Sequence, residues 1–301
     1  MSVSDSWWLK LKRAQKHLVD IQKELRQYSD SKPYEVVRLE PTKKQPLRWR
    51  YVLSITEPPN PMLPIMVGDF VHNLRAALDH FVANYVPANR SRNAYFPMLQ
   101  RDIWERDSVG HLLRTNRDAR RSYKSATKGL PDLALAAVEA VQPYHLHVAG
   151  FGQTPLGILS RLENADKHRD LIPISVDVRL SLLLLIRNEI VIHETLPEGK
   201  FVQDGTVVAA FTAAPDLQES EVHVQVSGPL HISIKLPALG GGKGVDRFEI
   251  TKIMLDALKH ERFVLRLLEA TVAPDAPKSI ASFFDRRDRL SGRSLVVSTS
   301  Q

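Results

Sequence analysis

The 301-residue chain contains no cysteine, and this absence removes several classes of chemistry at once. It excludes disulfide bonds, thiolate zinc sites and a cysteine nucleophile, so any metal would need histidine and carboxylate ligands. Long apolar segments are also lacking, because runs such as 182–186 fall far short of the roughly 20 residues of a membrane-spanning helix. The start of the chain lacks the basic-then-apolar order of a signal peptide. We therefore expect a cytoplasmic protein that does not enter a membrane.

Basic residues outnumber acidic ones and give a formal charge of +7. They are concentrated in four stretches: 10–16, 43–50, 114–128 and 286–293. Such patches can attract nucleic acid by neutralising phosphates and releasing counterions. Solvated surfaces and tails are the alternative, which is favoured because 34 acidic residues are interleaved and no recognised nucleic-acid-binding motif is present.

Hydrophobic periodicity predicts the elements of the first third of the chain. Apolar residues recur at helical spacing over 7–28, and the same is true of 65–85. Between them, 34–39 and 48–55 have the composition of β-strands and form a plausible hairpin. The proline-rich stretch 58–64 is expected to be an extended linker.

Shorter helices are predicted further along the chain, over 101–106, 108–125, 131–142 and 154–168. From 174 to 236 the apolar period changes to two, which is typical of half-buried antiparallel strands. We expect four or five of them, with turns at Asp204-Gly205 and at 197–199. A last helix is predicted over 247–270.

Because helical segments precede and follow the strands, the predicted fold is α+β, a helical bundle with an inserted antiparallel β-meander. Residues 1–273 are expected to form a single domain, and 274–301 a flexible C-terminal tail. Within that domain we expect three regions: a helical region 1–170 that includes the hairpin 34–55, the β-meander 171–238, and the closing helix 247–270.

The predicted helix 65–85 has one broad apolar face and an opposite face that is unusually polar. The polar face carries two histidines, two carboxylates, an amide and a guanidinium: Asp69, His72, Asn73, Arg75, Asp79 and His80. An exposed surface with pairs at i,i+4 is one interpretation. However, solvent-facing helices usually carry lysine and glutamate, whereas histidine, asparagine and aspartate are weaker helix formers.

The predicted helix 154–168 shows a similar pattern near its end. Arg161, Asn164 and His168 form a polar stripe, while Asp166 falls on the apolar side with Arg169 nearby. A carboxylate on an apolar face is costly unless it is paired or hydrogen-bonded. The alternative is a helix end at which Asp166 binds a neighbouring loop and Lys167, His168 and Arg169 satisfy the last carbonyls.

One contact between the two polar segments would explain both patterns. Asp166 needs a donor, and the helix that contains residues 72–80 offers histidine, asparagine and arginine donors. We therefore expect side chains of 72–80 to lie within about 3 Å of those of 161–169.

Both segments also resemble a known group of sequences. The stretches HisAsnLeuArgAlaAlaLeuAspHis (72–80) and GluAsnAlaAspLysHisArg (163–169) are similar to two hallmark segments of a widespread family of uncharacterised bacterial proteins. PheProMet (96–98) and ValGlnProTyr (141–144) fit the same pattern. The family has no assigned activity, so the resemblance implies no reaction.

A more distant resemblance concerns Arg75 and His80, whose spacing is similar to the Arg-x4-6-His motif of HEPN-type helical ribonucleases. The resemblance implies that the histidine acts as general acid or base and that the arginine stabilises phosphate charge. On this interpretation Asp79, His168 and Arg161 would support catalysis. Asp69, His72, Asn73, Asn164, Asp166, Lys167 and Arg169 would form a surrounding polar network.

Two functions follow from these observations. The first is a metal-independent RNase or phosphodiesterase that acts on RNA or another phosphate-bearing ligand. The second is a non-enzymatic binding or scaffold protein with a buried structural polar network. An open cleft at His80 would favour the first function, and a sealed polar core the second. We predict no cofactor and no metal, although His145 and His147 could present two imidazoles on one side of a strand. The oligomeric state is not predicted.

Overall fold

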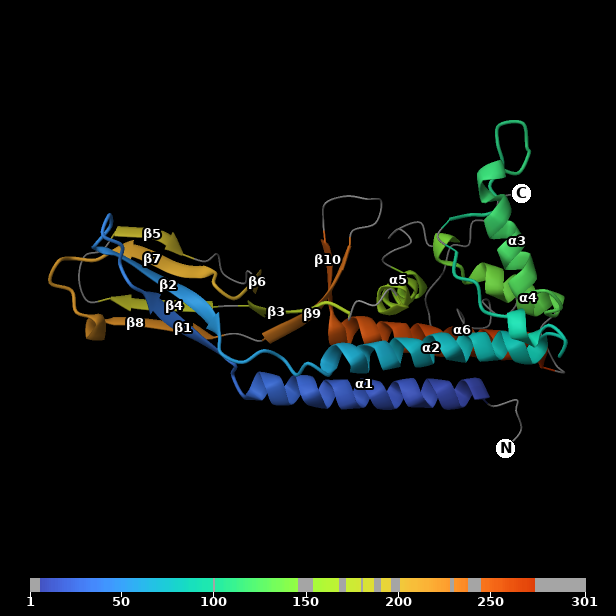
Figure 1. Ribbon diagram of the computed structural model, residues 1–301, viewed down its shortest axis with the longest axis horizontal. Helices are drawn as coiled ribbons and strands as arrows, with labels where there is room; N and C mark the ends of the chain where they lie inside the picture. The colour runs from blue at the N-terminus through green and yellow to red at the C-terminus, as the bar shows by residue number, and fades with distance from the viewer. Residues whose placement is uncertain are drawn as a thin grey trace, which may run out of the picture. The chain divides into compact units, whose positions relative to one another are not determined.

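The computed structural model describes residues 6–99, 101–145, 154–167, 172–179, 181–186, 191–195, 201–227, 230–237 and 245–273 (Figure 1). Helices and antiparallel sheets are both present, which confirms the predicted α+β class. The chain forms two compact units: unit 1 contains 1–18, 68–169 and 253–301, and unit 2 contains 19–67 and 170–252. That residues 1–273 fold as a single domain stays a prediction. Among the described residues, no helix combines the length and apolar character that a membrane span requires.

Three helices run side by side, α1 (Ser6–Asp30), α2 (Leu63–Tyr85) and α6 (Ile250–Val272) (Figure 1). Unit 1 contains α1 as far as residue 18, α2 from residue 68 and α6 from residue 253. Trp7 of α1 packs edge-on against Phe81 of α2, with ring centroids 5.3 Å apart. The indole N–H groups of Trp7 and Trp8 both donate to Glu269 of α6. Aromatic packing and these partly buried hydrogen bonds therefore join all three helices.

The α2 helix begins two residues earlier than predicted, at Leu63. Pro64 consequently lies in the first helical turn. Backbone N–H groups of that turn make no hydrogen bond within the helix, so the N–H that proline lacks costs nothing there. The apolar face predicted for this helix is buried: Phe70, Leu74, Leu78 and Phe81 are each almost completely inaccessible to solvent.

Three shorter helices complete unit 1: α3 (Arg117–Ala126), α4 (Asp132–Ala140) and α5 (Pro155–Lys167). Short 3-10 helices span Ser91–Asn93, Arg114–Asn116 and Pro143–His145. The start of α5 is capped by Thr154, whose Oγ1 accepts the Gly157 N–H at 3.0 Å. Gly129 turns the chain between α3 and α4 with φ +96°, and a Cβ there would lie 2.5 Å from Pro87 Cδ, so this turn requires glycine.

The helix predicted over 101–106 is wrong, and the one predicted over 108–125 begins later, at 114–117. The intervening residues instead form a tight turn around Asp107. Its Oδ1 accepts the N–H groups of Val109 and His111 at 3.0 and 2.8 Å, and Gly110 adopts φ +85°. An aspartate that binds the backbone just ahead of it offers the chain an alternative to the helix.

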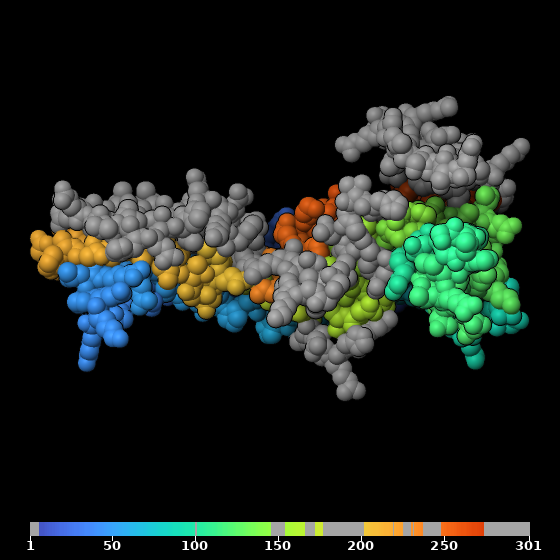
Figure 2. All heavy atoms as spheres, turned by 90° about the horizontal axis from the view of Figure 1, so that it is seen from above, coloured from blue at the N-terminus to red at the C-terminus, as the bar shows by residue number. Residues whose placement is uncertain are grey.

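Unit 2 contains the predicted hairpin, and this hairpin belongs to a larger sheet. Strand β1 (Tyr34–Leu39) pairs with β2 (Arg48–Ile55), β2 pairs with β7 (Val207–Thr212), and β7 pairs with β5 (Val191–Thr195). In Figure 2 the blue atoms of the hairpin lie against the gold atoms of residues 201–227. Leu53, Val208 and Phe211 form the buried centre of this sheet.

The remaining strands of unit 2 pair in nested order. Strand β3 (Ile174–Arg179) pairs with β9 (Leu230–Pro237), β4 (Ser181–Ile186) with β8 (Val222–Ser227), and β5 with β7. In a simple meander each strand would instead pair with the next one in sequence. The predicted antiparallel strands are therefore present, but the outgoing and returning halves of 174–237 pair with each other.

The Asp204-Gly205 turn is also present, with Gly205 at φ +74°, but it does not close a hairpin. Strand β6 (Phe201–Val202) pairs with β3, whereas β7 pairs with β2 and β5. The turn binds the end of β2, because Asp204 Oδ1 accepts the Ile55 N–H at 2.8 Å. The Asp-Gly pair identified the turn from the sequence. The residue that the turn binds, Ile55 of β2, lies 149 positions earlier in the chain.

At the end of unit 2, strand β10 (Val245–Glu249) pairs with β9 and was not predicted. Residues 247–249, expected to be helical, belong to this strand, and α6 begins at Ile250. The predicted turn at 197–199, the glycine cluster 240–244 and the C-terminal tail 274–301 lie outside the described residues.

Candidate functional site

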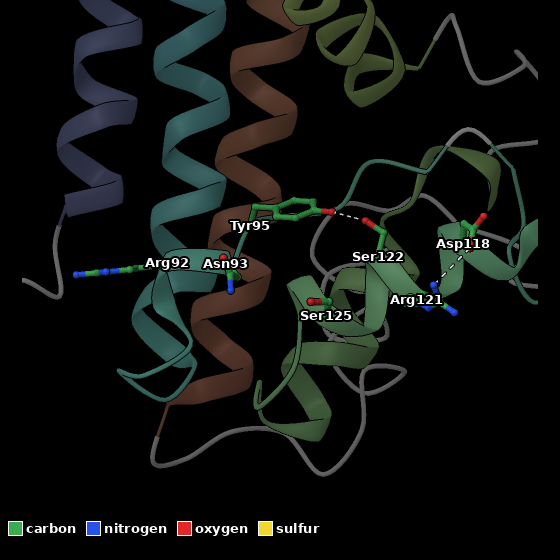
Figure 3. Close-up of a pocket in the computed structure, with 7 residues that line it drawn as sticks. All are labelled: Arg92, Asn93, Tyr95, Asp118, Arg121, Ser122 and Ser125. Atoms are coloured by element: carbon green, nitrogen blue, oxygen red, sulfur yellow. Dashed lines mark hydrogen bonds and ion pairs between the residues drawn. The ribbon is translucent and has the colours of Figure 1, made fainter.

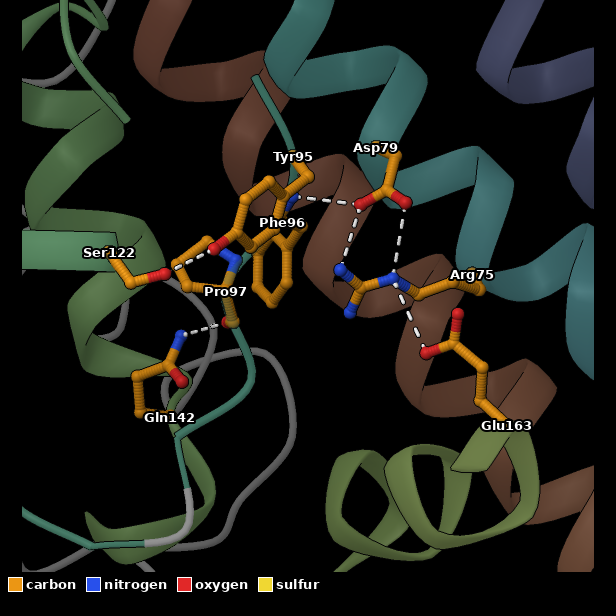
Figure 4. Close-up of polar contacts among 8 residues, drawn as sticks. All are labelled: Arg75, Asp79, Tyr95, Phe96, Pro97, Ser122, Gln142 and Glu163. Carbon is orange, nitrogen blue, oxygen red and sulfur yellow. Dashed lines mark hydrogen bonds and ion pairs between the residues drawn. The ribbon is translucent and has the colours of Figure 1, made fainter. Parts of the chain in front are cut away.

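The centre of the candidate site is an ion pair between Arg75 and Asp79, which lie one turn apart on α2. Arg75 Nε donates to Asp79 Oδ2, and Nη2 lies against Oδ1, both at 3.1 Å (Figure 4). The Arg75 side chain retains 12% of its accessible surface and that of Asp79 31%. A two-pronged pair of this kind is stronger and more precise than an ordinary surface ion pair, since the flat guanidinium matches the carboxylate.

Glu163 of α5 adds a second carboxylate to Arg75. Its Oε2 lies 3.7 Å from Arg75 Nε, and its side chain is 16% exposed. The two polar segments thus lie together, as expected, although 3.7 Å is an ion-pair distance and exceeds the predicted 3 Å. The contact is made by Glu163, which the sequence analysis did not select. Its signal was its position, four residues after the buried Leu159 and next to the buried Leu162.

Asp79 also holds the segment that follows α2. Its Oδ1 accepts the backbone N–H of the fully buried Phe96 at 2.8 Å. Three residues on, Gln142 Oε1 accepts the Leu99 N–H at 2.9 Å, and Gln142 Nε2 donates to the Pro97 carbonyl at 3.0 Å. Residues 96–99 are therefore fixed from both sides (Figure 4).

The network unites the four segments that the sequence analysis quoted together. Asp79 comes from 72–80, Glu163 from 163–169, Phe96 from 96–98 and Gln142 from 141–144. We call the set Arg75, Asp79, Glu163, Phe96 and Gln142 the Arg75 network. Its hydrogen bonds run largely to backbone groups, which is the usual way in which a buried polar cluster fixes the path of a chain.

Glu261 of α6 is a third carboxyl group beside this network. It is almost fully buried, and neither of its side-chain oxygens has a hydrogen-bond partner among the described residues. Burial raises the pKa of Glu261 well above its ordinary value; the Arg75 charge opposes this rise and the Asp79 charge adds to it. Burial therefore favours the protonated, neutral form of the Glu261 carboxyl group. The sequence held a signal for it, because Glu261 lies four residues after Ala257 and four before Leu265 on the apolar face of α6.

The Asp79 carboxyl is also affected by its surroundings. Burial raises the pKa of Asp79, while the Arg75 charge and the hydrogen bond from Phe96 act in the opposite direction. Although Asp79 has a cationic partner, desolvation is the larger effect. One guanidinium thus serves a region that contains three carboxyl groups, Asp79, Glu163 and Glu261.

The proposed catalytic pair, Arg75 and His80, is not brought together in this way. Five residues of α-helix turn the chain by about 500°, so the two side chains leave α2 roughly 140° apart. Arg75 contacts Asp79 and Glu163, whereas the half-buried His80 is influenced by Lys10 of α1. Burial lowers the pKa of His80, the Lys10 charge lowers it further, and the Asp79 charge opposes this change.

The other residues selected from the sequence are distributed between surface and interior. Asp69 and His72 are exposed, as is Asn164. The buried Asn73 donates its side-chain amide to the Asp69 carbonyl within α2 at 2.7 Å, which is a structural hydrogen bond. Arg161 is buried in α5. The side chains of Asp166 and Lys167, and all of His168 and Arg169, lie outside the described residues.

A hollow of about 700 Å³ lies beyond the network and is lined by one side of α3 and by the segment 92–95 (Figure 3). Its lining residues are Arg92, Asn93, Tyr95, Asp118, Arg121, Ser122 and Ser125, which we call the Tyr95 hollow. Tyr95 connects the two regions, because its hydroxyl hydrogen-bonds Ser122 Oγ at 2.6 Å and its ring lies 6.0 Å from the Arg75 guanidinium. His80 is not among the lining residues.

The described residues contain no group of three histidine or carboxylate side chains that could hold a metal ion. His145 ends a short 3-10 helix and is not in a strand, and its Nε2 lies 3.7 Å from Glu139 Oε1. His147, the second half of the predicted imidazole pair, lies outside the described residues.

Comparison with protein-family models, curated proteins and solved structures finds no match. The resemblances of 72–80 and 163–169, and that of the Arg75/His80 spacing to HEPN-type ribonucleases, therefore stay predictions.

Proposed function

We propose that this protein is a non-enzymatic binding or scaffold protein in which the Arg75 network is a structural brace. The observation that carries the proposal is the state of the Arg75 guanidinium, which is mostly buried and bound by both Asp79 and Glu163. Asp79 and Gln142 also accept hydrogen bonds from the backbone N–H groups of Phe96 and Leu99, respectively. Such an arrangement fixes a loop and supports the presentation of a surface.

The same charges argue against the alternative of an RNase or phosphodiesterase. The Asp79 and Glu163 carboxylates already neutralise the Arg75 charge. A phosphate that approached Arg75 would therefore be repelled by these two carboxylates. In phosphoryl chemistry the stabilising cation must be directed at the developing charge. His80 would also need to act on the same phosphate, yet its side chain leaves α2 in another direction. The nearby cation that lowers the pKa of His80 is Lys10, on α1.

An RNA cleavage assay tests this proposal. Purified protein should leave single-stranded and structured RNA intact in the presence of a metal chelator, and His80→Ala should behave identically. His72→Ala is the matched control, since His72 is an exposed histidine on the same helix. Cleavage by wild type and by His72→Ala that is lost in His80→Ala would sink the brace proposal and establish the nuclease.

The cytoplasm stays our proposed compartment. The support for it is compositional: a chain without cysteine has no disulfide that a reducing environment would break.

A further inference from the structure

The Tyr95 hollow differs from the Arg75 network because its lining residues are all exposed to solvent. The hydroxyls of Tyr95 and Ser122 hydrogen-bond each other, and Figure 3 shows the Arg92 side chain pointing away from them on one side and Arg121 lying beside Asp118 on the other. Asn93 and Ser125 add an amide and a third hydroxyl to the lining. These groups supply many hydrogen-bond donors and include a single carboxylate, Asp118.

Helix α3 is anchored on the side that does not line the hollow. Arg120 donates to the carbonyls of Ile103 and Leu113 at 2.8 and 2.9 Å, and the Lys124 ammonium lies 5.7 Å from the centre of the Trp104 ring. Tyr123, which lies between Arg120 and Lys124 in the sequence, is buried with 4% exposure. Two of the cations in the basic stretch 114–128 therefore have structural contacts that hold the helix in place.

Arg121 has no such anchoring role. It lines the hollow, its side chain is 71% exposed, and its ion-pair partner Asp118 lies 3.9 Å away and is 94% exposed. An exposed ion pair at this distance contributes little, so Arg121 can exchange Asp118 for another anion at small cost. Arg92, at the other side of the hollow, is also exposed.

We propose that the Tyr95 hollow binds the phosphate group of a nucleotide-sized ligand, an inference that rests on the proposed binding function and names its ligand class. Arg121 would bind the phosphate through its planar guanidinium, and the Ser122 and Ser125 hydroxyls would supply further donors. A volume of about 700 Å³ is appropriate for a ligand of this size.

The role of the Arg75 network in this proposal is positional. Phe96 and Leu99 are fixed by Asp79 and Gln142, and Tyr95 immediately precedes this fixed segment. The Tyr95 hydroxyl in turn holds Ser122 at 2.6 Å. The hollow is thus ordered before a ligand binds, which reduces the conformational entropy that its side chains would otherwise lose on binding.

Isothermal titration calorimetry with adenosine monophosphate tests the proposal, with adenosine and inorganic phosphate as the matched ligands. Adenosine monophosphate should bind at least about 10-fold more tightly than adenosine, since a charge-assisted contact is worth a factor of this size. Arg121→Ala should weaken binding about 10-fold. Arg117→Ala is the control, because Arg117 is an exposed arginine on the same helix that does not line the hollow.

A short 5′-phosphorylated RNA and its 5′-hydroxyl counterpart distinguish the source of the phosphate. Tighter binding of the phosphorylated RNA than of adenosine monophosphate, again dependent on Arg121, would identify an RNA end as the source; equal binding would identify a free nucleotide. Both outcomes support recognition of a phosphate group in the hollow.

Three results would overturn the inference: no binding of any phosphate ligand, equal affinity for adenosine and adenosine monophosphate, or equal losses in Arg121→Ala and Arg117→Ala. The last would indicate general attraction to a basic surface. These failures are distinct from failure of the brace proposal, which is decided by the dependence of RNA cleavage on His80.

Discussion

Two arginine–aspartate pairs on helices of unit 1 show how burial decides what the same chemistry does. In α2, Arg75 and Asp79 make two contacts at 3.1 Å with side chains that are 12% and 31% exposed. In α3, Arg121 and Asp118 lie 3.9 Å apart with side chains that are 71% and 94% exposed. The first pair is enclosed and linked to the backbone, whereas the second is solvated and open.

The difference teaches that the polar cluster most conspicuous in the sequence need not be the part that meets a ligand. A buried pair is worth little relative to well-packed apolar residues, but removal of one member leaves an uncompensated charge. A solvated pair is worth little in either direction. Stability measurements should therefore separate the two regions clearly.

The largest expected effect is that of Arg75→Met, which keeps much of the side-chain volume but removes the cation. Asp79 and Glu163 would remain next to the buried Glu261 without a positive partner. We expect a loss of about 3 kcal/mol, the low end for one partner of a buried pair, because Asp79 keeps 31% exposure. Urea denaturation followed by circular dichroism measures it.

The matched control for that variant is Arg121→Met, which makes the same chemical change in the exposed pair. Its expected effect lies within about 0.5 kcal/mol of zero. Equal losses in the two variants would contradict the distinction between a structural and an open region.

The next largest effect is expected for Gln142→Ala. Gln142 is fully buried and bonds Pro97, Leu99 and Val138, so its removal leaves buried backbone groups unpaired. We expect a loss of about 2–3 kcal/mol. Hydrogen exchange of the Leu99 amide, followed by NMR, should accelerate more than that of amides in α1. An unchanged exchange rate at Leu99 would show that Gln142 does not hold this segment.

Glu261 predicts a pH dependence of stability with a definite sign. Its folded pKa lies above the ordinary 4.5, so above that pH the unfolded chain loses this proton first. The free energy of unfolding should then fall as pH rises toward the folded pKa, and level off beyond it. Asp79, whose pKa burial also raises, contributes in the same direction.

Glu261→Gln removes the main titration and should flatten this slope, which for one proton cannot exceed about 1.4 kcal/mol per pH unit. At pH 8 the variant should be more stable than wild type. Denaturation curves at several pH values measure both effects, with the exposed Glu249→Gln as control. A wild-type slope that persists in Glu261→Gln would assign the pH dependence to other groups.

The smallest expected effect on stability is that of Ser122→Ala, which removes the hydroxyl that Tyr95 contacts at the edge of the hollow. The contact is exposed, so the loss should be about 0.5 kcal/mol or less. Binding of adenosine monophosphate should nevertheless weaken measurably. A large loss of stability would place Ser122 with the structural residues.

Much of the fold was predictable because its signals are local. The strands 34–39 and 48–55 were predicted with their observed bounds, and the α5 helix begins at Pro155, one residue after the predicted start at 154. The 101–106 helix was wrong because Asp102 Oδ1 accepts the Trp104 N–H at 2.7 Å, and the 108–125 helix begins late because the Asp107 turn competes with helical hydrogen bonds. The nested strand pairing was missed since a period of two identifies strands and says nothing about their partners.

The candidate site followed the same division. The sequence directed attention to the segments 72–80 and 163–169, and their contact is present through Arg75 and Glu163. Glu163 and Glu261 were overlooked because each was interpreted within its own helix, where a carboxylate has a default surface role. The Tyr95 hollow combines 92–95 with α3, and no periodicity links those two stretches.

By itself the sequence determined the helices and strands with strong periodicity, the α+β class, the absence of thiol chemistry and the polarity of the face that contains Arg75. Each of these depends on neighbours within a few turns or on composition. Only the tertiary structure decided that Asp79 would bind Phe96 and that Arg121 would remain exposed. It also decided that Glu261 would be buried with no hydrogen-bond partner in the part of the chain that the structure describes. Burial and partner choice depend on residues distant in sequence, and they set the desolvation that makes one arginine structural and leaves the other free to bind.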